Sequence, residues 1–184
     1  MNVLVPSPMD VSYLAAIRKN VVEFMAYVSD KYGHTTGRLL DIAPQVHEGA
    51  APFFKDFISI ETLDIDPNAN CTYTADITQY NPFIPDNYFD YVVCTEVLEH
   101  TLNPFDAIRE IERILTNNGL LFLSVPFNFR IHGPLPDCWR FTEHGLRALL
   151  YKFDVLELNA LETEDRPLMP IHYVVVARKR TLDT

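Results

Sequence analysis

Hydrophobic side chains along this chain follow two spacings, and these spacings predict helices and strands in alternation. Between residues 10 and 31, apolar residues recur at every third or fourth position, which predicts one amphipathic helix. Asp10 or Ser12 is its expected N-terminal cap, and Gly33 its expected end. Later apolar residues gather in short runs that are typical of buried strands. The expected strands span residues 37–43, 57–66, 72–76, 89–97, 120–127, 153–161 and 171–180.

Three further helices are expected between these strands, because polar, Pro or Gly residues bound the segments with helical patterns. They span residues 48–57, 103–119 and 142–153. Asn103 and Thr142 are the expected caps of the last two, and Gly119 is the expected end of the helix that Asn103 starts.

The alternation of strands and helices predicts one doubly wound α/β domain over residues 1–184. In such a fold, ligands bind at the carboxyl ends of the strands. The stretch between Asp66 and Cys71 leaves no room for a helix. Reduced helix cover is therefore expected between the second and third strands.

Four acidic residues stand at or just after predicted strand ends: Asp41, Asp64, Asp76 and Glu96. Since those ends lie along one rim of the sheet, the four carboxylates are expected to face one crevice. Asp64 follows Asp41 by 23 residues (64 minus 41), close to the spacing of an acid that binds both hydroxyls of an adenosine ribose. A carboxylate offers two acceptors to the two donors of the diol. A single such acid could instead cap a turn.

The charge and the cysteines narrow the choice of partners. With 15 basic and 25 acidic residues, the formal net charge is -10, which disfavours nucleic acids and anionic membranes as partners and favours a small molecule. Cys71, Cys94 and Cys138 lack the spacing of a zinc site and are expected to be reduced thiols. With no membrane-spanning apolar run and no secretion signal, a soluble cytoplasmic protein is expected.

The segment FDYVVCTEVLEH (residues 89–100) and the run IERIL, NNG and LLFLSVP after it carry a family resemblance. They resemble the S-adenosylmethionine-dependent methyltransferases with a Rossmann-like sheet, and are most similar to the small-molecule type 11 group. The resemblance covers roughly residues 38–153 and implies a mostly parallel seven-stranded sheet with an antiparallel last strand. HGPLPDCWRFTEHGLRALL (residues 132–150) is similar to a subset often associated with sugar or polysaccharide biosynthesis.

The resemblance implies S-adenosyl-L-methionine as cofactor and divides the chain around it. Residues 10–31 would form a cover helix, residues 38–125 the cofactor-binding core, and residues 126–184 a substrate loop, a helix and the terminal strand pair. The implied contacts are Asp41 and the backbone of Ala43, Pro44 and Gln45 for the methionine part, Asp64 and Ile65 for the ribose and adenine, Asp76 and Ile77 for the adenine, and Thr95 and Glu96 beneath the sulfonium, with His100 nearby.

The loop LLDIAPQVHEG (residues 39–49) departs from the family pattern. Positions 43, 45 and 47, where glycine is usual, hold Ala, Gln and His. Glycine permits positive φ and a close approach of the backbone to a ligand. We expect a widened or re-routed loop that still binds the cofactor. The alternative is a site that no longer functions.

The segment after the fifth strand, residues 128–141, is expected to form the acceptor pocket because it emerges on the ligand-bearing rim. His132 is the candidate base, since an imidazole can take up a hydroxyl proton at neutral pH. His100 and Asp137 are further catalytic candidates, and Asp137, Trp139 and Arg140 are the candidate substrate contacts. The alternative is that Asp137 and Arg140 pair with each other and brace the loop.

Together these features predict methyl transfer to an oxygen or nitrogen of a small metabolite, with a sugar or sugar nucleotide as a candidate acceptor. No metal ion is expected, because the sequence shows no cluster of Asp and His ligands. A homo-oligomer is compatible with this function. Two alternatives are a noncatalytic relative that acts in binding or as a scaffold, and a nicotinamide-dependent oxidoreductase. The oxidoreductase is disfavoured because the loop lacks the glycines that a pyrophosphate needs.

Overall fold

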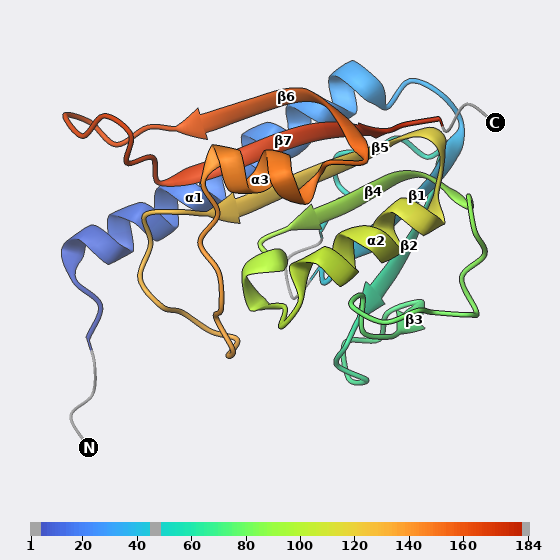
Figure 1. Cartoon of the computed structure of the whole chain (residues 1–184), viewed down its shortest axis with the longest axis horizontal. Helices are drawn as coiled ribbons and strands as arrows, with labels where there is room; N and C mark the ends of the chain where they lie inside the picture. Colours follow the sequence, from blue (N-terminus) through green and yellow to red (C-terminus); the bar gives the residue numbers. More distant parts are fainter. Residues whose placement is uncertain (1–4, 45–48, 182–184) are drawn as a thin grey trace.

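The computed structural model describes residues 5–44 and 49–181, which form one seven-stranded sheet with helices on both faces (Figure 1). The strand order is β3-β2-β1-β4-β5-β7-β6. The strands are β1 (Gly37–Ile42), β2 (Ile58–Asp64), β3 (Tyr73–Thr74), β4 (Phe89–Thr95), β5 (Leu115–Pro126), β6 (Phe153–Leu161) and β7 (His172–Lys179). From β3 to β5 in this order, each strand is parallel to its neighbours, whereas β7 is antiparallel to both β5 and β6. The predicted α/β fold with an antiparallel last strand is confirmed.

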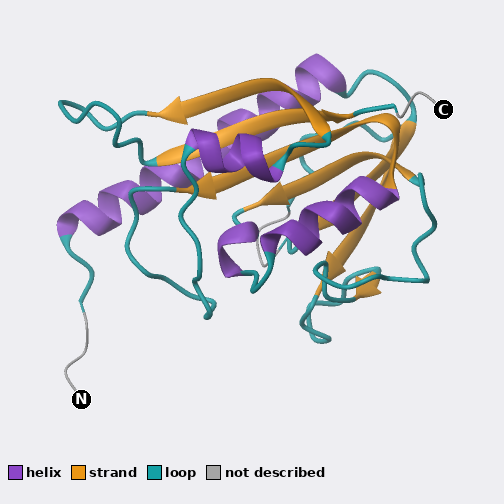
Figure 2. Cartoon of the chain, in the orientation of Figure 1, coloured by secondary structure: helices purple, strands orange, loops and turns teal. Residues whose placement is uncertain are grey.

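One long helix covers one face of the sheet, and shorter helices cover the other face (Figure 2). The long helix α1 (Pro8–Tyr32) packs on one face, where its residues Phe24, Met25 and Val28 join a buried apolar cluster. Helices α2 (Pro104–Ile114) and α3 (Glu143–Leu149) pack on the other face within a larger buried cluster. The single-turn helix η1 (Leu98–His100) follows β4. Helix α1 thus corresponds to the cover helix expected over residues 10–31.

The start of α1 differs slightly from the prediction. Ser7, rather than Asp10 or Ser12, is the cap, and its side chain accepts a hydrogen bond from the backbone N–H of Asp10. The Asp10 carboxylate accepts in return from the Ser7 backbone N–H at 2.9 Å. This reciprocal capping box explains why Asp10 lies inside the first turn instead of before it. The helix ends at Gly33, as predicted.

The predicted helix over residues 103–119 is too long. Asn103 caps α2 as expected, but the helix ends at Ile114, and β5 begins at Leu115. The carbonyls of Arg113 and Ile114 accept hydrogen bonds from the backbone N–H groups just before β4, at 3.0 and 2.8 Å. Because sheet pairing takes up these last carbonyls, the helix cannot continue to Gly119.

The predicted helix over residues 48–57 is wrong for the part of this segment that the structure describes. Residues 49–54 form turns, and Phe54 N–H donates to the Ala50 carbonyl at 3.4 Å without a continuing ladder. Pro52 has no N–H to extend a helix from this turn. Between β2 and β3, residues 65–72 contain no helix, which confirms the reduced cover that the short spacing predicted.

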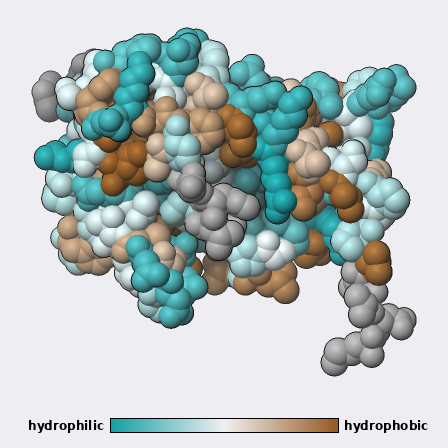
Figure 3. All heavy atoms as spheres, turned by 180° about the vertical axis from the view of Figure 1, so that it is seen from behind, coloured by the Kyte–Doolittle hydropathy of each residue, from teal (hydrophilic) through white to brown (hydrophobic). Residues whose placement is uncertain are grey.

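The sheet reverses its order between β1 and β4, and this topological switch point is where doubly wound folds bind ligands. On the face shown in Figure 3, apolar groups alternate with hydrophilic ones. None of the described helices is both long enough and apolar enough to cross a bilayer. The three cysteines are free thiols.

Candidate functional site

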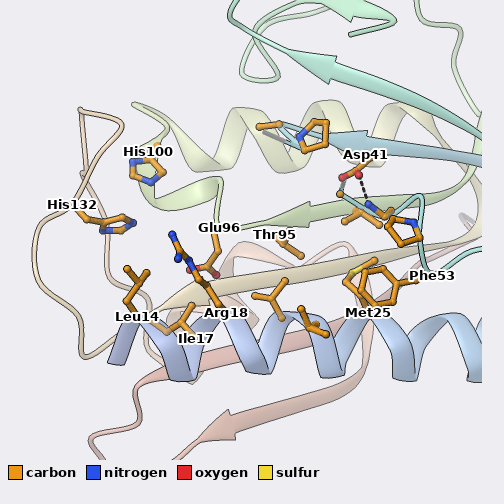
Figure 4. Close-up of a pocket in the computed structure, with 18 of the residues that line it drawn as sticks. Leu14, Ile17, Arg18, Met25, Asp41, Phe53, Thr95, Glu96, His100 and His132 are labelled. Atoms are coloured by element: carbon orange, nitrogen blue, oxygen red, sulfur yellow. Dashed lines mark hydrogen bonds between the residues drawn. The ribbon is translucent and has the colours of Figure 1, made fainter. Parts of the chain in front are cut away.

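A cavity of about 670 Å³ lies at the switch point between β1 and β4 (Figure 4). Its residues come from five parts of the chain: α1, the end of β1 and the residues after it, the turn at residues 49–53, the end of β4 and the segment after it, and the loop after β5. The lining residues are Leu14, Ile17, Arg18, Val21, Val22, Met25, Asp41, Ala43, Pro44, Gly49, Ala50, Pro52, Phe53, Val93, Thr95, Glu96, His100, Phe129, His132 and Gly133.

One wall of the cavity is the apolar face of α1. Leu14, Ile17 and Met25 point toward the cavity from this helix (Figure 4), and Val21 also lines it. Ile17 and Met25 are buried. The sequence predicted burial for these residues from their spacing but gave no sign that they border a pocket, because packing against a sheet and lining a cavity demand the same apolar pattern.

Asp41, the second-last residue of β1, has a buried side chain at one end of the cavity. Its Oδ2 accepts a hydrogen bond from the Ala50 backbone N–H at 2.6 Å. Burial raises the pKa of Asp41 to about 6, and the hydrogen bond from Ala50 only partly opposes this. Gly49 packs so closely that a Cβ there would lie 2.2 Å from Oδ2. The backbone at Gly49 and Ala50 therefore lies close against the buried carboxylate of Asp41.

Ala43 takes a left-handed backbone conformation, with φ of 52°, although it has a side chain. This is the conformation that glycine in the family loop would adopt without strain. The N–H of Ala43 is held by the Leu63 carbonyl at 2.7 Å. Pro44 also lines the cavity, whereas Gln45 lies outside the described residues. The loop thus begins with a glycine-like bend despite its sequence.

The residues predicted for the adenosine part are not among those that line the cavity. Asp64 ends β2, where its Oδ1 accepts from the Asp66 N–H at 2.8 Å. Ile65 next to it is 68% exposed, which leaves an apolar surface free beside a carboxylate. Asp76 accepts from the N–H and hydroxyl of Thr78, and Ile77 is buried in the core. These four predicted contacts remain predictions.

Glu96 follows β4 and is fixed from two sides. Its Oε1 accepts from the Ser124 hydroxyl at 2.8 Å and from His172 Nε2 at 2.6 Å. The Nδ1 of His172, a fully buried ring at the start of β7, accepts from the Asn20 amide of α1 at 2.8 Å. Thr95 precedes Glu96 in the cavity wall. Sequence reasoning missed Asn20 and His172, because their roles depend on contacts between distant segments.

The opposite end of the cavity holds His100 and His132, whose ring centroids are 4.9 Å apart. Glu99 lies beside them with a fully buried side chain. Burial raises the pKa of Glu99 well above its usual range, and the charge of Glu96 adds to this effect. Burial lowers the pKa of His132, although the carboxylate of Asp137 opposes the change. Sequence reasoning named both histidines and missed Glu99.

Asp137 and Arg140 pair with each other in the loop after β5. Their two hydrogen bonds join Nη1 to Oδ1 at 2.5 Å and Nη2 to Oδ2 at 2.7 Å. Asp137 also accepts from the His132 N–H at 2.9 Å. Although burial opposes it, the hydrogen bonds from Arg140 and His132 bring the pKa of Asp137 down to about 2. These contacts are the ones that the bracing alternative predicts.

Trp139 is anchored at the same loop and remains partly accessible. Its indole N–H donates to the Thr101 carbonyl at 2.8 Å, and the residue as a whole is 40% exposed. The backbone N–H groups of Cys138 and Trp139 both donate to the Glu99 carbonyl, at 2.6 and 3.2 Å. The loop is thus tied to η1, while a contact between Trp139 and a substrate remains a prediction.

Comparison with known families decides what kind of domain carries this cavity. A family model described as a methyltransferase domain matches residues 13–175, which is most of the chain. The chain belongs to this family. The resemblance inferred from the strand-four and strand-five motifs is thereby confirmed at the level of the methyltransferase fold and family, whereas the type 11 group and the sugar-associated subset are not.

Solved structures and a curated relative are similar to this methyltransferase domain. An S-adenosylmethionine-dependent methyltransferase from Methanosarcina mazei superposes with a TM-score of 0.64 at 17% identity, over 82% of this chain and 96% of that one. The 1,6-didemethyltoxoflavin-N1-methyltransferase of Burkholderia thailandensis, solved with bound 1,6-didemethyltoxoflavin and S-adenosylhomocysteine, superposes with a TM-score of 0.62 at 17% identity, over 97% of this chain and 94% of that one. The comparisons support S-adenosylmethionine as the cofactor.

One curated relative is the ubiquinone biosynthesis O-methyltransferase of Glaesserella parasuis, which is 47% identical over 36 residues, or 20% of this chain. The chain spans only 3% and 15% of the lengths of the curated relatives that it matches.

For the methyltransferase domain, we expect Ala43→Gly to leave affinity for S-adenosylhomocysteine within about tenfold, or roughly 1.4 kcal/mol. Ala43 already holds the left-handed bend, so glycine relieves strain without opening a new site. Titration calorimetry of both proteins checks this. An affinity gain far above tenfold would mean that the natural loop obstructs the cavity, and the noncatalytic alternative would then be favoured.

Replacing Asp41 with Asn should change stability and cofactor affinity in opposite directions. The folded-state pKa of about 6 lies above the usual 3.8, so the folded protein binds more protons between these values, and stability falls as pH rises through about 4 to 6. At pH 7.5, Asp41→Asn should therefore raise the free energy of unfolding, by on the order of 1 to 3 kcal/mol.

The same variant should bind S-adenosylhomocysteine at least about tenfold more weakly, because hydrogen bonds to a charged group are worth about 1.5–3 kcal/mol. Denaturant unfolding at several pH values and calorimetry measure the two effects. Asp56→Asn, at an exposed acid in the next turn, is the matched control. Lower stability together with unchanged affinity would assign Asp41 a purely structural role.

Proposed function

We propose that this domain uses S-adenosylmethionine to methylate an oxygen or nitrogen of a small metabolite, with a sugar or sugar nucleotide as a candidate acceptor class. One observation carries the proposal: a single cavity has a buried carboxylate, Asp41, at one end and two imidazoles, His100 and His132, at the other. One end suits the amino acid part of the cofactor, and the other suits an acceptor that must lose a proton.

The size of the cavity and the charge of its lining support such a cofactor. Its volume of about 670 Å³ is within the usual range of small-molecule sites. Ala43 has a left-handed backbone conformation, and the absence of a side chain at Gly49 lets the backbone there lie close to the Asp41 carboxylate. Asp41 and Glu96 line the cavity, so its carboxylates favour a ligand that carries positive charge.

S-adenosylmethionine supplies, when bound, a methyl group on a positively charged sulfur that leaves as a neutral thioether. Asp41 and the backbone of residues 43 and 44 are proposed to hold the methionine part, Asp64 the ribose hydroxyls, and Asp76 with Ile65 and Ile77 the adenine. Thr95 and Glu96 border the reacting region. Because Ser124 and His172 fix Glu96, its carboxylate stays in place as the acceptor binds.

The acceptor is proposed to bind between α1 and the loop after β5. His132 is aimed into this space and can take the proton that a hydroxyl loses as its oxygen bonds to the methyl carbon. Asp137 orients this ring, since its Oδ2 lies 3.0 Å from Nδ1. The main demand on the site is to hold the acceptor atom in line with the bond that breaks.

Methyl transfer to a panel of acceptors tests this proposal. Sugars, sugar nucleotides, phenols and amines would be offered with isotopically labelled S-adenosylmethionine, and labelled product measured. Product with one class names the acceptor. Tight cofactor binding with no product from any class would favour the noncatalytic alternative.

A further inference from the structure

Glu99, His100 and His132 form a compact group at the acceptor end of the cavity. The Oε1 of Glu99 lies 3.8 Å from Nε2 of His100 and 3.9 Å from Nε2 of His132. Ligand atoms of the three side chains all lie within 4.8 Å of one another. These distances are too long for hydrogen bonds, but the three ligand atoms surround one common point.

Both imidazoles are oriented so that an unprotonated nitrogen faces Glu99. The Nδ1 of His100 lies 3.0 Å from the Pro136 carbonyl, which can only accept a hydrogen bond, so Nδ1 carries the hydrogen. The Nδ1 of His132 lies 3.0 Å from Asp137 Oδ2 and 3.3 Å from the Arg130 carbonyl, again acceptors only. In each neutral ring, the lone pair is therefore on Nε2, the atom nearest to Glu99.

Glu99 itself is a buried acid without a donor. Its side chain is 0% exposed, and neither carboxylate oxygen has a hydrogen-bond partner among the residues that the structure describes. An unpaired buried carboxylate costs several kcal/mol. One proton could bridge only two of these three ligand atoms in a hydrogen bond, whereas a cation at the common point would contact all three.

We propose that Glu99, His100 and His132 bind one divalent transition-metal ion, such as Zn²⁺, Co²⁺ or Mn²⁺, at the acceptor end of the cavity. Two imidazoles and a carboxylate are a ligand set that these ions prefer, whereas Mg²⁺ prefers oxygen alone. Bonds of about 2.0–2.1 Å place tetrahedral ligand atoms about 3.4 Å apart. Each Glu99–His pair would therefore need to close by about half an ångström, and the two imidazole nitrogens, which lie within 4.8 Å, by no more than about 1.4 Å. The carbonyl and carboxylate behind the rings supply the orientation that metal-bound histidines usually have.

The ion would have open coordination positions toward the cavity, since both histidines line it. Resting on the proposed function, we assign these positions to an oxygen of the methyl acceptor. A hydroxyl bound to such an ion loses its proton more readily than a free one. In the metal-bound protein, the two imidazoles then act through the ion rather than as bases.

Metal titration of the untagged chain, freed of metal by dialysis against a chelator, tests the site without any methyl transfer. Co²⁺ and Zn²⁺ would be titrated by calorimetry, and Co²⁺ also by its visible absorption. We expect one ion per chain and much weaker binding of Mg²⁺. Glu99→Gln and His132→Ala should each lower Co²⁺ affinity at least about a hundredfold, the upper end of what loss of a supporting residue costs.

His144→Ala removes an exposed histidine outside the cavity and is the matched control, expected to bind Co²⁺ as the natural chain does. Melting curves and titration with S-adenosylhomocysteine show whether each variant is folded. If Glu99→Gln fails to fold, His132→Ala and the spectrum of the natural chain decide. No stoichiometric Co²⁺ or Zn²⁺ binding by the natural chain, or equal binding by the folded His132 variant, would overturn the metal site. Intact cofactor binding in the same samples would leave the proposed function standing.

Discussion

His132→Ala is expected to lower turnover by about ten- to ten-thousandfold, the usual range for loss of a general base. Cofactor affinity should stay unchanged, since His132 lies at the acceptor end of the cavity, away from Asp41. Melting temperature should also change little, because the Asp137 carboxylate keeps its hydrogen bonds from Arg140 and from the backbone N–H at position 132. Steady-state kinetics and melting curves measure the three quantities.

The bracing alternative predicts a different pattern for this variant. If His132 only secures the loop, the substitution lowers stability, and activity falls in proportion to the unfolded fraction. His144→Ala, with the same change at an exposed site, is the control for nonspecific effects. A loss of stability without a specific loss of turnover would exclude His132 from the reaction. The Co²⁺ titration decides whether His132 acts as a base or as a ligand of a metal ion.

Asp64→Ala is expected to weaken S-adenosylhomocysteine binding by about 1.5–3 kcal/mol, the range for hydrogen bonds to a charged group. The carboxylate ends β2 next to an exposed apolar side chain, Ile65, which is the combination that a ribose and an adenine require. Stability should barely change, since the one hydrogen bond described for this carboxylate closes a local turn with Asp66. Calorimetry at one pH gives the difference.

Asp66→Ala is the matched control for Asp64. Asp66 is an exposed acid two residues away in the same turn, and its backbone N–H, which binds Asp64, is unaffected by the substitution. We expect this control to bind S-adenosylhomocysteine as the natural chain does. Equal affinities for the natural chain and the Asp64 variant would show that the ribose is held elsewhere.

Most of the fold could be predicted because the central strands β4, β5 and β7 contain apolar runs that a buried sheet accommodates. β6 has the predicted limits, and β4 and β7 differ by no more than two residues at an end. The errors lie where local pattern and tertiary contact compete. Residues 115–119 follow a helical segment in sequence, yet the pairing of Leu115 with Phe89 draws them into the sheet.

The acid at one end of the cavity and the histidines at the other were predictable from their positions after strands. Glu99 was not, because a glutamate in the segment VLEH has no sequence feature that announces full burial. A usable signal was present all the same: an adjacent Glu–His pair after β4 and a histidine after β5 are brought together by the parallel pairing of these strands. The sequence-based expectation that no metal binds rested on linear spacing, whereas the proposed site depends on residues that the fold brings together.

Direct titration with S-adenosylhomocysteine tests the central claim that this cavity is a working cofactor site. By calorimetry, we expect one molecule of S-adenosylhomocysteine bound per chain, with a dissociation constant well below millimolar. We expect no comparable binding of NAD. Binding should compete with S-adenosylmethionine and weaken in the Asp64→Ala and Asp41→Asn variants. Affinity no better than millimolar for the natural chain, or tighter binding of NAD, would contradict the account.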